Sequence, residues 1–256
     1  MIPRIWALAM NTAREAVRSK LLYSFLFFAI LMIASGVGLA ALSYVERERI
    51  LQDVGIASIR FFSVAIAIFV GVGLIHKEVE RRTLHTILSK PLSRSEFLLG
   101  KYFGLVMIIW LQMAIMVAFF VGISLLTGAP LGISHWASFL LTAVELAVVV
   151  AFATLFSAFT TPMLASFFSC SLWVMGHLTR NLRDHGQEAS QAIVREATVW
   201  MHRILPDLES FNLSKEASHL LPVAASDVWF PVMYGFGYVA VLLVVATTIF
   251  ERRDFR

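Results

Sequence analysis

The sequence has little charge and almost no cysteine. Only 15% of its 256 residues are charged, whereas 59% are hydrophobic and the mean hydropathy is +0.78. Soluble domains carry about 25% charged residues, so this composition is typical of an integral membrane protein. The single cysteine, Cys170, excludes a disulfide framework within one chain.

The sequence also lacks several motifs, and each absence argues against one class of function. The sequence contains no Gly-x-x-x-x-Gly-Lys-Ser/Thr phosphate loop, so the chain does not bind ATP through that motif. Its basic residues are spread over short loops rather than gathered on one face, which gives no support for nucleic-acid binding. The sequence also lacks the internal repeat that an inverted-repeat transporter would show. Four histidines match no metal-ligand spacing, and we expect them to face solvent or lipid headgroups: His177, His185, His202 and His219.

Apolar runs of about 20 residues recur along the chain, the length a helix needs to cross about 30 Å of hydrocarbon. We predict an all-α membrane protein with a single transmembrane domain over residues 1–256 and six spans at 21–43, 56–75, 102–126, 136–159, 163–178 and 229–250. Residues 2–20 are expected to form an amphipathic interfacial helix. Only Pro162 and two threonines separate the fourth span from the fifth, so a kink in one continuous helix remains an alternative.

Lysine and arginine counts predict the orientation. With six spans, the side that holds both termini and residues 76–101 has thirteen basic residues, and the other side has eight. Cytoplasmic loops carry the excess of basic residues, so both termini are expected in the cytoplasm and the segment 179–227 outside it. Arg60 lies near one end of the second predicted span, where its side chain is expected to snorkel to the interface. Helical spacing predicts an amphipathic helix over 189–204, and a short helix is expected over 214–221.

Residues 76–101 form a polar segment between the second and third spans. Its apolar residues Val79, Thr83, Leu84, Ile87 and Leu88 fall on one helical face. Pro91 ends that helix, and Ser93 with Glu96 predicts a capping box at the start of the next. Such a helix suits a groove on a partner protein, although it could instead lie on lipid headgroups.

The spacing within this segment resembles a family signature. The run Glu78-x-Glu80-Arg-Arg-Thr83-Leu84-x-x-Ile87-Leu88-Ser-Lys-Pro91, followed by Gly100-Lys101, is similar to that of the ABC-2 type permeases. The six spans, the amphipathic N-terminal helix, the long last outer loop and the basic C-terminal end also match that family. Arg82 departs from the pattern, because the family commonly has glycine before Thr-Leu.

The resemblance implies a membrane subunit of an ATP-driven transporter, an exporter in the bacterial inner membrane. A separate ATPase would bind ATP and Mg and hydrolyse ATP, so no catalytic residue, cofactor or metal is assigned to this chain. Two permeases, as a homodimer or a related heterodimer, would pair with two ATPases. The resemblance assigns ATPase coupling to Glu78, Glu80, Arg81, Thr83, Leu84, Ile87, Leu88 and Pro91, and Lys101 would anchor the third span at the interface.

A second, shorter resemblance lies in the outer segment. The run Leu205-Pro-Asp-Leu-x-x-Phe-Asn-Leu213 is similar to the group that contains the permease of nitrous oxide reductase maturation. That group is functionally mixed, so no substrate carries over. The segment 179–227 is long enough to meet an extracytoplasmic partner.

Glu145 is the charged residue nearest the middle of a predicted span. A carboxylate there costs roughly 2.5–3.5 kcal/mol on insertion scales, so it must face protein or water. One hypothesis places Glu145, together with Gln112, on a translocation path or a dimer interface. The alternative is a buried hydrogen bond from Glu145 to a serine, a threonine or Gln112.

Two rival functions remain open from the sequence. A non-transporting ABC complex could pass mechanical work to an envelope partner through the outer loop. An intramembrane hydrolase could use Glu145 and a histidine, but the fourth span has neither paired glutamates nor a His-x-x-x-His arrangement for acid–base or metal chemistry.

Overall fold

The computed structural model describes residues 2–43, 45–80, 93–187 and 205–252, and this part of the chain contains helices and no strand. The all-α prediction is therefore confirmed. The elements are α1 (Ile2–Val17), α2 (Lys20–Ala41), α3 (Arg47–Glu80), α5 (Arg94–Thr127), α6 (Ile133–Ser157), α7 (Pro162–Gln187), the 3₁₀ turn η1 (Leu208–Phe211), α9 (Ser214–Ser218) and α10 (Ala225–Arg252).

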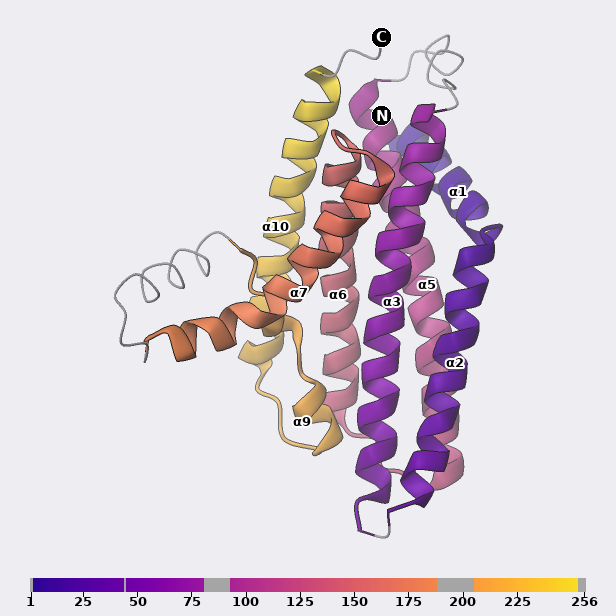
Figure 1. The fold of residues 1–256 in the computed structure, drawn as a ribbon, viewed down its shortest axis with the longest axis vertical. Helices are drawn as coiled ribbons and strands as arrows, with labels where there is room; N and C mark the ends of the chain where they lie inside the picture. The colour runs from indigo at the N-terminus through magenta and orange to yellow at the C-terminus, as the bar shows by residue number, and fades with distance from the viewer. Residues whose placement is uncertain (1, 44, 81–92, 188–204, 253–256) are drawn as a thin grey trace.

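Five helices run along the long axis of the molecule (Figure 1). These are α2, α3, α5, α6 and α10, and within the described residues each is long and apolar enough to cross a membrane. The end of α3, the start of α5, the end of α10 and the N-terminus lie at the same end of the bundle (Figure 1). The chain is thus a multi-pass membrane protein with both termini on one side of the bundle.

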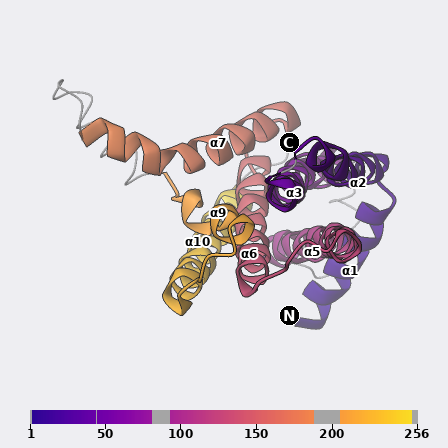
Figure 2. The ribbon, with the colours of Figure 1, turned by 90° about the horizontal axis from the view of Figure 1, so that it is seen from below.

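The predicted fifth span is α7, which is not among those five helices. Its second half leaves the bundle, as the view along the long axis shows (Figure 2). The number of six spans therefore stays a prediction. The break before α7 is settled, because α6 ends at Ser157 and α7 begins at Pro162. Proline is well tolerated at the first position of a helix, because an N–H at that position would have no hydrogen-bond partner within the helix.

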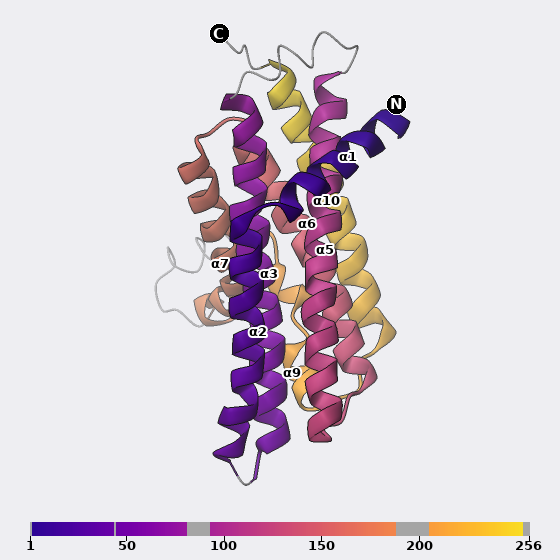
Figure 3. The ribbon, with the colours of Figure 1, turned by 90° about the vertical axis from the view of Figure 1, so that its right-hand side faces the viewer.

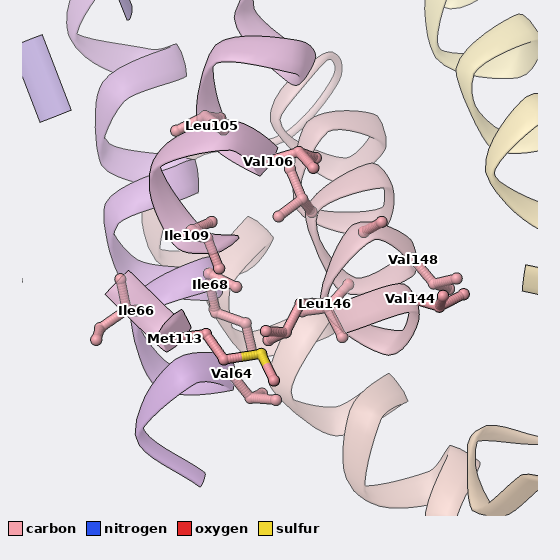
Figure 4. Close-up of a cluster of buried hydrophobic side chains, with 14 of the residues drawn as sticks. Val64, Ile66, Ile68, Leu105, Val106, Ile109, Met113, Val144, Leu146 and Val148 are labelled. Atoms are coloured by element: carbon pink, nitrogen blue, oxygen red, sulfur yellow. The ribbon is translucent and has the colours of Figure 1, made fainter. Parts of the chain in front are cut away.

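The core lies where α3, α5 and α6 meet (Figure 4). Ile66, Leu105, Ile109, Leu146 and Val150 are at most 1% exposed. α6 is the most enclosed of the five long helices, since 78% of its most apolar window is buried. A polar side chain on the buried part of α6, such as that of Glu145, is therefore enclosed by other protein groups.

α1 crosses α5 obliquely near the end that holds the termini (Figure 3). The crossing is close because a Cβ at Gly104 would lie 2.4 Å from the Ala9 carbonyl oxygen, and one at Gly100 would lie 2.6 Å from Leu8 Cβ. Small residues spaced four apart allow such close helix contacts in membrane proteins. Between them Lys101 is 1% exposed, with Nζ 3.6 Å from a Glu15 carboxylate oxygen. Lys101 thus ties α1 to α5, and its predicted role as an anchor of the third span at the interface stays a prediction.

The predictions for the two polar segments, 76–101 and 179–227, have different outcomes. The capping box is confirmed, because the Ser93 side chain accepts from the Glu96 N–H and the Glu96 side chain accepts from the Ser93 N–H. The coupling residues from Arg81 to Pro91 and the predicted helix over 189–204 lie outside the described residues. α9 confirms the predicted short outer helix but ends at Ser218.

Candidate functional site

Glu145 is the centre of the candidate site and has no exposed surface. Arg60 of α3 donates from Nε at 2.9 Å and from a terminal nitrogen at 2.8 Å, both to Oε2 of Glu145. Oε1 accepts from the indole N–H of Trp173 at 2.8 Å and contacts Nε2 of His177 at 2.9 Å. Each carboxylate oxygen therefore has two partners, which is what a buried charge requires.

His177 extends this network to a second carboxylate. Its Nδ1 lies 3.0 Å from Oε2 of Glu209, while its Nε2 faces Glu145. An ionised carboxylate can only accept hydrogen bonds, so both contacts form when both ring nitrogens carry protons. Arg60, Glu145, His177 and Glu209 then alternate in sign and sum to zero charge.

Glu209 lies on η1, outside the membrane-spanning helices. Partial burial acts to raise the pKa of Glu209, but the hydrogen bonds from His177 and Asn212 outweigh it and hold the pKa below its usual range. The Asn212 amide donates to Oε1 of Glu209 at 2.8 Å. The side-chain oxygen of Asn212 accepts from the backbone N–H of Ser214 at 3.2 Å and from the Ser214 hydroxyl at 2.8 Å. The network therefore continues to the start of α9.

Two glycines allow η1 to reach this position. A Cβ at Gly176 of α7 would lie 2.7 Å from the Leu208 side chain. A Cβ at Gly235 of α10 would lie 2.4 Å from Val144 and 3.1 Å from Phe211. Leu208 and Phe211 are fully buried in these contacts. η1 is thus packed into the bundle between α6, α7 and α10, which brings Glu209 to His177.

Gln112 does not join the network. It is 2% exposed on α5, and within the described residues neither its amide oxygen nor its nitrogen has a hydrogen-bond partner. Ser63 on α3 is 1% exposed and its hydroxyl is likewise unpartnered there. Gly55 lies against Phe120 and Gly71 against Leu105, so the antiparallel helices place Ser63 and Gln112 at the same level. A role for Gln112 in a translocation path stays a prediction.

The bonded partners of Glu145 differ from those considered in the sequence analysis. They are Arg60, Trp173 and His177, not a serine, a threonine or Gln112. Arg60 does not snorkel, because its guanidinium group pairs with Glu145 and its side chain is only 11% exposed. His177 is not solvated, since it lies between two carboxylates.

The sequence contains a signal for the pairing of Arg60 with Glu145. Arg60 and Glu145 are opposite charges in two different predicted spans, and intramembrane charges usually pair. Glu209 carried no such signal, because it occupies an unspecified position of the Leu205–Leu213 run. Two of the residues predicted to couple to an ATPase, Glu78 and Glu80, fall in the last turn of α3. The others lie outside the described residues: Arg81, Thr83, Leu84, Ile87, Leu88 and Pro91.

The geometry of Glu145 disfavours acid–base catalysis. A general base needs a substrate or water proton within hydrogen-bond reach. Both Glu145 oxygens already have two protein partners, and the side chain has no exposed surface. The arrangement suits a charge network that ties helices together rather than a hydrolytic centre.

These features define an all-α, multi-pass membrane protein whose helices are tied by a buried charge network. A family model described as ABC-2 family transporter protein matches residues 6–255. The chain therefore belongs to the ABC-2 family of transporter membrane components, and it is a transmembrane subunit that associates with an ABC ATPase. Comparison with curated proteins finds no match. The match is to the family as a whole and does not single out the nitrous oxide reductase maturation group.

Proposed function

We propose that this chain is the membrane subunit of an ATP-driven exporter in a bacterial inner membrane, and that two copies pair with two ATPases. The ATPase would dock on residues 76–101, in the cytoplasm, and both termini would lie on that side. A single permease domain would span residues 1–256. ATP and Mg would bind only in the ATPase.

The observation that carries this proposal is the continuity of α3. It runs unbroken over 34 residues from Arg47 to Glu80, about 51 Å at 1.5 Å per residue. Its last five residues, 76–80, are the first residues of the proposed docking segment, and Arg60 lies about 30 Å from Glu80 along the same helix. A displacement at Glu80 would therefore move the residue that holds Glu145.

The other side of the docking segment is also fixed to the bundle. The C-terminal part of the segment is the start of α5, which begins with the Ser93–Glu96 capping box. Arg94 donates to the backbone oxygens of Phe250 at 3.5 Å and Glu251 at 3.2 Å, near the end of α10. Movement of the segment would thus act on α3, α5 and α10 together, which suits a coupling element better than a helix resting on headgroups.

Paired substitutions test the docking site. Leu84→Asp with Ile87→Asp places charge on the proposed contact face, and we expect loss of ATPase co-purification and of permease-stimulated ATP hydrolysis. Leu42→Asp is the matched control, because Leu42 is 80% exposed near the opposite end of the bundle. Unchanged co-purification of the double variant would overturn the assignment of this segment.

The rival mechanical role is separated by a second experiment. Deleting residues 187–205 removes much of the outer segment. An exporter should then show altered export in vesicles. Unchanged export together with loss of an envelope partner would favour the non-transporting complex.

A further inference from the structure

A cavity of about 700 Å³ opens where α1 joins α2 beside α3. Its polar wall includes Arg14, Arg18 and Ser19, and its apolar wall includes Phe69 and Leu74 of α3. α1 crosses the bundle toward α2 at this end of the molecule (Figure 3). The cavity therefore lies where an amphipathic helix meets two membrane-spanning helices.

The polar wall carries positive charge that the protein does not neutralise. Arg14 lies in the last turn of α1 and Arg18 directly follows the helix, and both side chains line the same cavity. Within the described residues, neither takes part in an ion pair. Glu15 also borders the cavity, but its carboxylate pairs with Lys101 at 3.6 Å. Two guanidinium groups thus remain available to an anion.

The apolar wall offers room for a hydrocarbon chain. Phe69 is 47% exposed, and Gly73 lies one turn further along α3, beside the buried Leu74. A Cβ at Gly73 would meet no atom within 4 Å. An unobstructed apolar surface therefore runs along α3 from the charged rim.

We propose that this cavity binds one anionic phospholipid, with its phosphate between Arg14 and Arg18 and an acyl chain along Phe69 and Gly73. Guanidinium groups match phosphate oxygens in bidentate geometry, and basic pockets between membrane helices bind anionic headgroups. A soluble phosphate would use the charged wall only, whereas a phospholipid uses both walls. The lipid would hold α1 from the face opposite to its contact with Gly104.

Lipid retention by the intact chain tests the site. The purified protein is equilibrated with equal amounts of phosphatidylglycerol and phosphatidylcholine that carry the same chains, and bound lipid is counted by native mass spectrometry. We expect phosphatidylglycerol to be retained preferentially. Arg14→Gln with Arg18→Gln should lower that preference by up to roughly thirtyfold, from the attraction of about one charge pair per arginine.

The matched control is Arg47→Gln with Arg49→Gln, which removes the same charge at the opposite end of the bundle. It should change the preference by less than about twofold if the site is local. An equal loss in both double variants would reveal only general attraction to the basic protein and would overturn the proposal. So would equal retention of the two lipids by the unaltered chain.

A second pair of variants tests the apolar wall without changing charge. Gly73→Leu should fill the path of the acyl chain and lower phosphatidylglycerol retention, because its side chain enters open space. Gly38→Leu on α2 is the control, since a Cβ there also meets nothing within 4 Å. Equal retention in these two variants would place the lipid elsewhere. Displacement by glycerol 3-phosphate would assign the site to a soluble phosphate and would also refute it.

Discussion

The Arg60–Glu145 pair allows a double-mutant test of the buried network. Arg60→Met and Glu145→Leu each remove one charge and leave the other enclosed. The double variant removes both and replaces them with apolar side chains of similar length. We expect each single substitution to destabilise the protein strongly and the double substitution to recover much of the loss.

The burial of the two side chains determines how much stability each substitution should cost. Glu145 has no exposed surface and Arg60 is 11% exposed, so neither charge can be rehydrated without repacking. Removing one partner of a buried pair costs about 3–5 kcal/mol, whereas replacing both by apolar residues is often neutral or favourable. The two single losses should therefore exceed the double loss by at least about 3 kcal/mol. Exchanging the two charges is a poorer test, because the Trp173 N–H would then point at an arginine.

Unfolding by a titration from mild to denaturing detergent, followed by tryptophan fluorescence, measures these differences. The surface pair Arg49–Glu46 is the control, because its side chains are 42% and 56% exposed. Replacing it by Met and Leu should cost less than about 1 kcal/mol. Additive losses from the two single substitutions at Arg60 and Glu145 would refute the assignment of an energetically coupled pair. Normal assembly and transport by Glu145→Leu would show that the network has no functional role.

Two further predictions concern the ends of the bundle. Gly104→Leu should detach α1 from α5, because its Cβ would lie 2.4 Å from the Ala9 carbonyl oxygen; faster proteolysis after residues 14 and 18 would report this, and unchanged cleavage would contradict it. The pKa of Glu209 is lowered by folding from its ordinary value of 4.5, so its stabilising effect is present above that pH and is lost as the pH falls through the lower folded value. Glu209→Gln should therefore flatten the loss of stability below about pH 5, and parallel curves for the two proteins would contradict this.

The helices were predictable because hydrophobic length is a local property. The predicted spans at 21–43, 136–159 and 229–250 agree with α2, α6 and α10 to within four residues at each end. The span at 102–126 lies within α5, which begins eight residues earlier. Pattern alone missed the extension of α3 down to Arg47, because Arg47, Arg49 and Asp53 interrupt the apolar run. The capping box before α5 was predictable for the same reason, since its two residues are three positions apart.

The network was not predictable in the same way, because its members come from four segments. A single sequence shows that Glu145 needs a partner but not which helix faces it. Hydropathy starts the second span at residue 56 and so predicts Arg60 near its end, whereas α3 begins nine residues earlier, at Arg47. The position of η1 depends on close approaches at Gly176 and Gly235, and hydropathy contains no information on these contacts.

The burial of the four charges indicates where the network can open. Exposure rises from 0% at Glu145 and 11% at Arg60 to 17% at His177 and 26% at Glu209. Separating Arg60 from Glu145 would leave both charges away from water, whereas Glu209 can be hydrated when it leaves His177. The α3–α6 link is therefore the permanent one, and the contact between η1 and α7 is the one that a transport cycle can break at least cost. Substitutions at Arg60 should accordingly reduce stability more than substitutions at Glu209.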